Sequence, residues 1–365
     1  MSMNRRQFSM ASVAALGAVG LNTLAVGESA MNTQILLDSR PVGKPSAKNF
    51  RLDSVAIPEV GEGEMLLRTR YLSLDPYMRG RMNAGKSYAD RVELGDVMVG
   101  GTVSEVVASN HPKFSKGELV NASSGWQEYE VSNGQGLMKL DPRIPRPSYA
   151  LGVLGMPGLT AYVGLLDLGE PKAGDTVVLA ASTGAVGSVV GQIAKLKGCR
   201  VVGIAGAKEK CDYAVKELGY DACISHYDDD MADQLKEACP KGIDVYFENV
   251  GGSSWEAVMP LLNNFARVPV CGLIAHYNET ELPPGPDRMS MLQAMILTRS
   301  IKMQGFIVSN YIHRIPDFIG DMSKWMAEGK IHYREDMVEG LENAPEAFLG
   351  LFKGANFGKL VVKVS

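Results

Sequence analysis

Two patterns of apolar and polar positions divide the chain. From Met31 to about Leu140, short apolar runs alternate with turns rich in Gly, Pro, Asn and Asp. This spacing predicts a compact β-rich, barrel-like domain. The runs that we expect to form strands include EMLLRTRYLSL, VMVGGTVSEVVAS and GELVNAS. Prolines at positions 142, 145 and 147 mark the edge of this unit.

After Gly174 the pattern changes, because short apolar runs now alternate with segments that carry apolar residues at helical spacing. Such alternation predicts parallel βαβ units in a doubly wound sheet. A helix is expected over residues 152–169, entered at Pro157. The expected strands are TVVLAA, CRVVGIAG, ACISH, IDVYFENVGG and ARVPVCGLIAHYN.

The last segment, from about Asp321, contains a helical pattern around MSKWMAEGK and ends in the strand-like run GKLVVKVS. That terminal strand could return to the first domain and make the second domain an insertion. The expected organisation is therefore α/β, with residues 1–30 as an extension, residues 31–152 with 321–365 as the β-rich domain, and residues 153–320 as the parallel-sheet domain.

The composition of the chain argues against several classes of function. With 365 residues, 45% of them hydrophobic, the chain can bury a large core, and its length suggests two domains. A formal net charge of −4 gives no strong field that would favour nucleic acid or an anionic membrane. The five cysteines form no C-x-x-C pair, which argues against a disulfide framework and a thiolate zinc site.

The N-terminus has a different character from the rest of the chain. Arg5 and Arg6 precede an apolar run of signal-peptide length, too short to span a bilayer as a stable helix. The pattern Arg5-Arg6-x-Phe8 resembles a twin-arginine export signal and predicts a periplasmic protein. The alternative is a start at Met31, where MNTQILLDSRPVG could begin a cytoplasmic protein by itself.

One stretch, AASTGAVGSVVGQIAKLKG, nearly matches the dinucleotide-binding fingerprint G-x-G-x-x-G. Gly184 and Gly187 occupy its second and third glycine positions, and Ser182 occupies the first. The second glycine allows close approach to a pyrophosphate, and the third allows the helix to pack on the strand. The first glycine only eases the tight turn, so we expect the turn, with Ala185 and Val186, to bind a dinucleotide at the start of a helix.

The end of the next strand distinguishes NAD from NADP. An NAD site places Asp or Glu there to bind the ribose 2′-hydroxyl. This strand ends at Ala205-Gly206 without a carboxylate, and Lys208 and Lys210 follow. Ammonium groups attract a 2′-phosphate, so we predict NADP(H), with Lys210 as the phosphate contact. The alternative is that both lysines are simply solvated at the start of a helix.

Later strand ends also carry small or polar residues, and ligands bind at this edge of an open parallel sheet. Asn249 ends one strand, and the segment Cys271–Asn278 follows another. These residues are candidates to line the nicotinamide and its ribose. His226, after ACIS, could contact the adenosine or could be structural.

Together these residues resemble a known family, the zinc-free medium-chain dehydrogenases/reductases. The chain is most similar to the group of leukotriene dehydrogenases, prostaglandin reductases, plant double-bond reductases and bacterial NADPH-dependent curcumin reductases. The resemblance covers residues 31–365. It is carried by ILLDSRPVGKPSAKNFRL, LSLDPYMRGRM, ASTGAVGSVVGQIAKLKGCRVVGIAG, VYFENVGG, CGLIAHYN, MQGFIVS and KGANFGKLVVK.

The resemblance implies a GroES-like β-rich domain, an inserted Rossmann domain, a cleft between them and a homodimer. His226 stands where close relatives often have tyrosine. Zinc-dependent relatives carry Gly-His-Glu and a cysteine in the first domain, whereas this chain has GDVMVGGTVSEVV there, so we expect no metal site. The cofactor contacts implied by the resemblance are Gly184, Ala185, Val186, Gly187, Lys210, Asn249, Cys271, Gly272, Asn278, Phe306, Ile307, Val308 and Asn356.

Without a metal, such an enzyme is expected to reduce an activated C=C bond in an enal or enone. Hydride addition at the β carbon leaves an enolate, which requires a hydrogen-bond donor at its oxygen. Tyr277 is the candidate donor, and the alternative is that it only forms part of the cleft wall. Tyr77 and Arg79 are expected to face the cleft and orient the substrate, and the alternative is a structural turn held by hydrogen bonds of the arginine. Alternatives at the same site are quinone reduction, oxidation of a hydroxyl group, or binding of NADPH without catalysis.

Overall fold

The computed structural model describes residues 31–282 and 285–365. The predicted twin-arginine signal falls within residues 1–30 and so lies outside the described residues. Over the described ranges, no helix has the length and apolar character needed to cross a bilayer.

The β-rich lobe is built around a seven-stranded sheet of order β14-β15-β3-β4-β5-β7, in which β6 also pairs with β3. Its strands are β3 (Met65–Ser73), β4 (Thr102–Ser109), β5 (Leu119–Ala122), β6 (Tyr129–Ser132), β7 (Met138–Lys139), β14 (Glu335–Glu339) and β15 (Lys359–Lys363), beside a separate antiparallel pair, β1 (Met31–Leu37) and β2 (Phe50–Ala56). Its helical segments are η1 (Ala47–Asn49), α1 (Met78–Arg81), η2 (Pro147–Leu151), η7 (Leu341–Asn343) and α9 (Ala344–Leu351).

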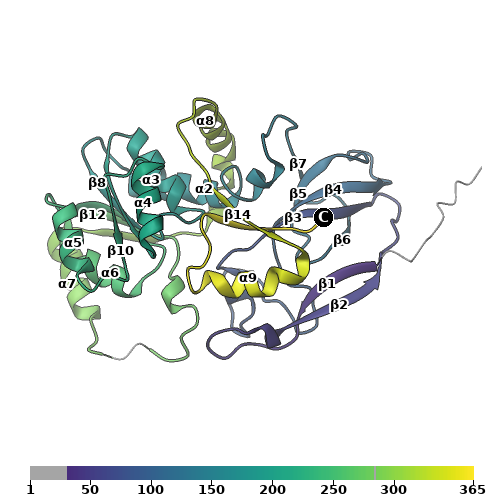
Figure 1. Ribbon diagram of the computed structural model, residues 1–365, viewed down its shortest axis with the longest axis horizontal. Coiled ribbons are helices and arrows are strands. Elements are labelled where there is room, and N and C mark those ends of the chain that lie inside the picture. The colour runs from purple at the N-terminus through teal and green to yellow at the C-terminus, as the bar shows by residue number, and fades with distance from the viewer. Residues whose placement is uncertain (1–30, 283–284) are drawn as a thin grey trace, which may run out of the picture. The chain divides into compact units, whose positions relative to one another are not determined.

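The long strand β3 organises this lobe. One edge pairs with β4, while the other edge is divided between β6, along residues 65–68, and β15, along residues 71–73. Leu72 and Val362 bury their side chains with Trp126 and with Phe348 of α9, the yellow helix in Figure 1. Since β15 ends the chain, the prediction that the terminal strand returns to the first domain is confirmed.

The second lobe contains a six-stranded parallel sheet of order β10-β9-β8-β11-β12-β13. Its strands are β8 (Thr176–Ala180), β9 (Arg200–Ala205), β10 (Ala222–Ser225), β11 (Ile243–Phe247), β12 (Leu262–Val270) and β13 (Lys302–Gly305). Its helical segments are α2 (Met156–Val163), η3 (Gly164–Gly169), α3 (Gly187–Leu196), α4 (Lys208–Lys216), α5 (Met231–Ala238), α6 (Gly252–Val258), η4 (Met259–Leu261), η5 (Ile274–His276), α7 (Met289–Arg299), η6 (Val308–Arg314) and α8 (Ile315–Ala327).

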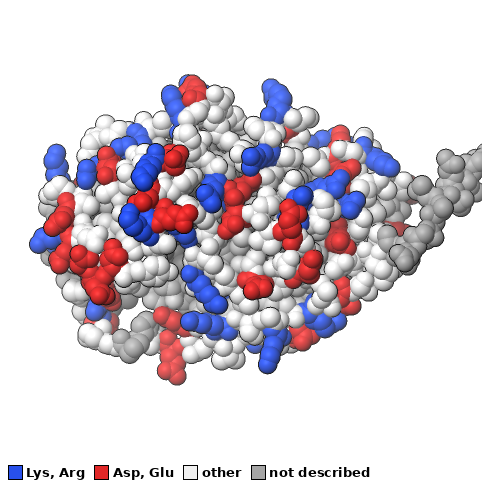
Figure 2. All heavy atoms as spheres, viewed as in Figure 1, with Lys and Arg blue, Asp and Glu red and all other residues white. Residues whose placement is uncertain are grey.

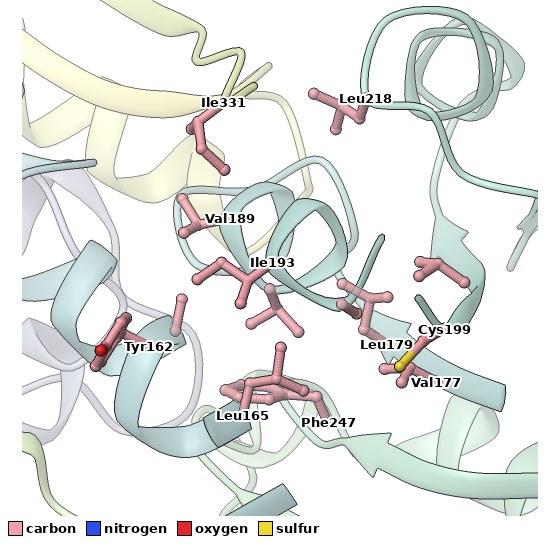
Figure 3. Packing of buried hydrophobic residues seen from close by; sticks show 14 of the residues in the cluster. Tyr162, Leu165, Val177, Leu179, Val189, Ile193, Cys199, Leu218, Phe247 and Ile331 are labelled. Carbon is pink, nitrogen blue, oxygen red and sulfur yellow. The ribbon is translucent and has the colours of Figure 1, made fainter. Parts of the chain in front are cut away.

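Both faces of the inner strands β8, β9 and β11 are buried, which explains why these strands read as nearly continuous apolar runs. In β8, Val177 and Leu179 pack into one core with α2, α3 and α8 (Figure 3). The alternate residues, Val178 and Ala180, pack into a second core on the opposite face with α5 and α6. The sheet therefore forms a rigid platform whose carboxyl edge can position ligand-binding residues.

Two predicted boundaries need correction. The helix expected over residues 152–169 begins at Met156, and its last six residues, Gly164–Gly169, widen into the π-helical segment η3. The domain boundary placed at residue 321 falls inside α8. Phe318 and Met322 of α8 pack together in the core of the parallel-sheet lobe, so the whole helix belongs to that lobe.

Charged side chains on the visible face are interspersed rather than segregated. Figure 2 shows Lys and Arg beside Asp and Glu across this face, in keeping with a formal net charge of only −4. Such a mixed surface produces little long-range steering of a charged macromolecule.

Candidate active site

A cavity of about 1240 Å³ lies between the two lobes. Its wall on the parallel-sheet side is formed where the strands end, the edge at which open α/β sheets bind ligands. Six lining residues each lie within two residues of the end of a different strand, and these are Ala181, Gly206, His226, Asn249, Cys271 and Phe306. The cleft therefore receives one contribution from every strand of the sheet.

The glycine turn explains how serine replaces the first glycine of the fingerprint. The residue with left-handed backbone is Ala181, at φ 52°, so Ser182 needs no special conformation. Ser182 is buried, and its Oγ lies 3.5 Å from Cys223 Sγ. The amide of Gly184 donates to the Ala181 carbonyl over 2.9 Å and closes the turn.

The third glycine is required by close packing. A Cβ on Gly187 would lie only 2.3 Å from the Ala181 carbonyl oxygen. Gly187 also begins α3, whose first amide groups have no carbonyl partners within the helix and suit an anion. Gly184, Ala185, Val186 and Gly187 all line the cleft, as the predicted pyrophosphate contact requires.

The two lysines after β9 differ in position. Lys208 Nζ binds its own helix neighbour Asp212 at 2.7 Å and does not line the cleft. Lys210 lines the cleft, and its Nζ donates to the carbonyls of Gly354 and Asn356, each at 2.6 Å. Burial lowers the pKa of Lys210. A 2′-phosphate placed here would meet an ammonium group and no carboxylate from the end of β9.

Two aromatic side chains follow β10 at the same end of the cleft. His226 and Tyr227 both line it, and their ring centroids lie 4.3 Å apart. Burial and the charge of Lys210 lower the pKa of His226, which favours the neutral imidazole. Sequence reasoning identified His226 but missed Tyr227, whose position next to it was the available signal.

The turn after β11 is held by a buried carboxylate that sequence reasoning also missed. One oxygen of Glu248 accepts from the amides of Val250 and Gly251, at 2.7 and 2.8 Å. Burial raises the pKa of Glu248. Beside it, Asn249 lines the cleft and donates to the Ala180 carbonyl at 3.0 Å, which ties the ends of β8 and β11 together.

The loop after β12 brings Cys271, Gly272 and Tyr277 to the cleft. Burial raises the pKa of the Cys271 thiol to about 12, so it is not a thiolate nucleophile. The Tyr277 hydroxyl accepts from the Leu273 amide at 3.3 Å, and burial raises its pKa. A phenol that remains protonated keeps its proton available for donation.

The β-rich lobe contributes Tyr77, which also lines the cleft. Burial, followed by the charge of Asp75, raises the pKa of Tyr77. Two protonated phenols, from different lobes, are therefore available to a ligand. The remaining predicted contacts Phe306, Ile307, Val308 and Asn356 line the cleft as well.

Arg79 and Asn278 do not line the cleft, which corrects the expectations that Arg79 faces it and that Asn278 contacts the cofactor, and favours the alternative of a structural turn held by Arg79. Arg79 is buried, and its Nε donates to Asn278 Oδ1 at 3.0 Å. Its other nitrogens donate to Asn83 Oδ1 at 2.6 Å and to the Gly43 carbonyl at 2.8 Å. Arg79 therefore has a structural role, because its hydrogen bonds hold α1 to the loop after β12.

The residue of this segment that reaches the cleft is Arg81. Tyr77 precedes the short helix α1 with helical backbone angles, so residues 77 and 81 share one face and residue 79 points elsewhere. The i, i+4 spacing in YMRGR was the signal that sequence reasoning did not use. Tyr88, further along the same loop, also lines the cleft and was also missed.

Comparison with known proteins identifies the family. Residues 33–140 match a model described as the N-terminal domain of oxidoreductase, and residues 185–327 match one described as zinc-binding dehydrogenase. The chain is 58% identical over 335 residues to the NADPH-dependent curcumin reductase of Escherichia coli (strain K12), covering 92% of this chain and 97% of that protein.

Two further relatives agree with this match. The 2-alkenal reductase (NADP(+)-dependent) of Nicotiana tabacum is 40% identical over 347 residues, which is 93% of this chain and 99% of the relative. The crystal structure of CurA in complex with NADPH from Vibrio vulnificus superimposes with a TM-score of 0.89 at 61% identity, covering 91% of this chain and 99% of that one.

The chain belongs to the zinc-free medium-chain dehydrogenases/reductases, in the group of curcumin, prostaglandin and 2-alkenal reductases. The resemblance drawn from the sequence is confirmed, as is the fold, a GroES-like domain with an inserted Rossmann domain. The family model named for zinc covers the parallel-sheet lobe. Among the described residues, no group of three or more His, Cys, Asp or Glu side chains is placed to hold a metal ion.

The described cleft fits the dinucleotide of this family. Gly187 leaves space that a Cβ would fill, α3 begins at the turn, and Lys210 lies at the end of β9 where no carboxylate stands. The residues that would hold the cofactor are therefore the turn at 184–187 for the pyrophosphate, Lys210 for a 2′-phosphate, and Asn249 with Cys271 near the nicotinamide.

Proposed function

We propose that this protein reduces the activated C=C bond of α,β-unsaturated aldehydes and ketones. The coarser function follows from its family: it is an NADPH-dependent oxidoreductase of the curcumin, prostaglandin and alkenal reductase group. The observation that carries the finer proposal is the pair of protonated phenols, Tyr77 and Tyr277, which line one cleft from opposite lobes.

NADPH, when bound, supplies the hydride that adds to the β carbon. The task left to the chain is to stabilise the negative charge that develops on the carbonyl oxygen. Tyr277 can donate a hydrogen bond to that oxygen without losing its proton, because its pKa is raised. Its present partner, the Leu273 amide, is a donor to it and leaves the phenolic hydrogen free.

Part of the remaining cleft wall is apolar. Leu154, Pro157, Ile312 and Phe318 line it, and they present apolar surface beside the polar groups. Apolar surface beside a hydrogen-bond donor lowers the local dielectric constant, which strengthens a hydrogen bond to a developing enolate. The same surface suits the hydrocarbon part of an enal or enone.

The test is a turnover screen with the purified protein. NADPH oxidation would be followed with cinnamaldehyde, a chalcone and an alkenal, and separately with a quinone; NADP+ reduction would be followed with alcohols. We expect turnover with the enals and enones, and a saturated carbonyl product. Turnover confined to quinones or alcohols would contradict the proposal, and NADPH binding with no turnover on any acceptor would indicate a non-catalytic protein.

We also propose a homodimer, which the family resemblance implies, and we place its interface along β13. Within the described residues β13 pairs only with β12, and all four of its residues are exposed. An uncovered edge strand is a ready template for a second chain. Light scattering should give about twice the mass of one chain, and a single-chain mass at micromolar concentration would contradict the dimer.

A further inference from the structure

Most charged side chains around the cleft are already paired. Lys359 Nζ lies 3.2 Å from Asp75 Oδ1, and Lys139 Nζ lies 2.7 Å from a carboxylate oxygen of Glu118. Arg81 lines the cleft too, but its guanidinium makes no hydrogen bond or ion pair with any described residue. Its Nε is shielded from solvent and has no acceptor.

An unpaired buried guanidinium nitrogen is costly. A buried donor without an acceptor destabilises the fold, and it does so more strongly when the group is charged. The structure offers Arg81 no acceptor, so a ligand is the natural source of one. Arg81 follows Tyr77 by one helical turn, on the same face.

The surroundings of Arg81 indicate what that ligand is. Tyr77 and Tyr88 line the cleft together with Arg81, and the positive charge of Arg81 opposes the rise that burial causes in the pKa values of both phenols. One segment of the β-rich lobe, residues 77–88, thus contributes three hydrogen-bond donors to the cleft lining. A planar guanidinium matches a carboxylate by two parallel hydrogen bonds, and phenols can add further donors.

The phosphates of a dinucleotide are unsuitable partners for Arg81. Their expected contacts, the start of α3 and Lys210, lie in the parallel-sheet lobe, whereas α1 belongs to the β-rich lobe. Because those groups already serve the phosphates, the substrate is the natural source of an anion for Arg81. Two substrate anions are conceivable, a permanent carboxylate and the transient enolate oxygen, and they predict different kinetics.

We propose that Arg81 is a specificity-determining residue that binds a permanent carboxylate on the substrate, so that the preferred substrates are enals or enones carrying an acidic group remote from the C=C bond. This inference rests on the proposed C=C reduction. Tyr77 and Tyr88 complete the subsite as neutral donors.

The test compares para-carboxycinnamaldehyde with its methyl ester, which removes the charge and keeps the reacting bond. In Arg81→Met, kcat/KM for the acid should fall by about 10–100-fold, mainly through KM, because uniform binding energy is lost. The ester should change by less than about threefold. Arg81→Lys should recover part of the preference for the acid. Thermal unfolding of both variants checks that the fold is kept.

Lys139→Met is the matched control, since it removes a cleft-lining charge that already has a partner. It should leave the ratio of acid to ester unchanged. Equal losses for acid and ester in Arg81→Met, expressed in kcat, would overturn the proposal in favour of enolate stabilisation. No change with either substrate would overturn it as well.

Direct binding separates failure of this inference from failure of the proposed reaction. Calorimetry would measure para-carboxycinnamaldehyde binding to the protein loaded with NADP+, with no turnover required. Weaker binding to Arg81→Met than to the unmodified protein supports the subsite even if neither aldehyde is reduced. Equal binding to both proteins overturns it, whatever the turnover screen shows.

Discussion

At the scale of single residues, Lys208 and Lys210 show how position within one helical turn decides a role. Lys208 is paired with Asp212, and Lys210 faces the cleft. We expect Lys210→Ala to raise the dissociation constant for NADPH by about 10–100-fold, because a charge-assisted hydrogen bond to the phosphate is lost. Lys208→Ala should change it little. Fluorescence titration with NADPH and NADH checks this, and equal effects on both cofactors would exclude the phosphate contact.

Tyr277 carries the second prediction at this scale. Tyr277→Phe should lower kcat on an enone by about 10²-fold, since the donor to the developing oxyanion is removed. NADPH affinity should stay the same. Tyr129→Phe, on β6 and away from the cleft lining, serves as the control. Unchanged turnover in Tyr277→Phe would assign oxyanion stabilisation to another group, with Tyr77 the next candidate.

The sequence predicted correctly which residues line the cleft where backbone position decides it, and failed where side-chain direction decides it. Gly184 and Gly187 were found because a turn followed by a helix constrains them. Arg79 and Arg81 differ by two positions, and only the orientation of α1 decides that Arg81 enters the cleft. Glu248 was missed because its partners are the amides of its own turn, a pattern that apolar spacing does not reveal.

At the scale of elements, two glycines in the turn between β8 and α3 have different roles. Gly187 is expected to be needed for folding, and Gly184 is expected to be needed for binding of the cofactor. In Gly187→Ala the new Cβ would clash with the Ala181 carbonyl, so we expect a loss of about 1–3 kcal/mol of stability and weak NADPH binding. In Gly184→Ala the nearest atom is 3.1 Å away, so the fold should survive while the pyrophosphate is crowded. Thermal unfolding and NADPH titration together distinguish the two, and identical behaviour would contradict this separation.

The type of most elements was predictable because the spacing of apolar residues differs clearly between strands and helices. The residues at which elements end were not predictable from this spacing. Five strands of the parallel sheet, β8 to β12, contain apolar runs and were predicted, whereas the exposed edge strand β13, with the sequence KMQG, was missed because it lacks such a run. The ends of α2 and α8 depend on tertiary packing. Gly164 is the first residue of the π-helical segment η3. A Cβ on this glycine would lie 2.6 Å from the ring of Phe306, so the helix packs here against a segment that is far away in the sequence.

At the scale of the whole molecule, we propose that the protein is exported through the twin-arginine route. Arg5 and Arg6 with the following apolar run are the sequence features that support it. Replacing both arginines by lysine should leave the protein in the cytoplasm, whereas the unmodified chain should appear in the periplasmic fraction. Cytoplasmic retention of both proteins would instead favour translation from Met31.

The pairing of β15 with β3 also sets an order of events during synthesis. Ser365 Oγ donates to the Thr69 carbonyl across a sequence separation of 296 residues. The part of the β3 edge that pairs with β15, residues 71–73, therefore has no partner strand until the ribosome has translated the entire inserted lobe. Throughout that interval the unfinished sheet displays open backbone groups, which makes the nascent chain a natural client for chaperones that shield strand edges.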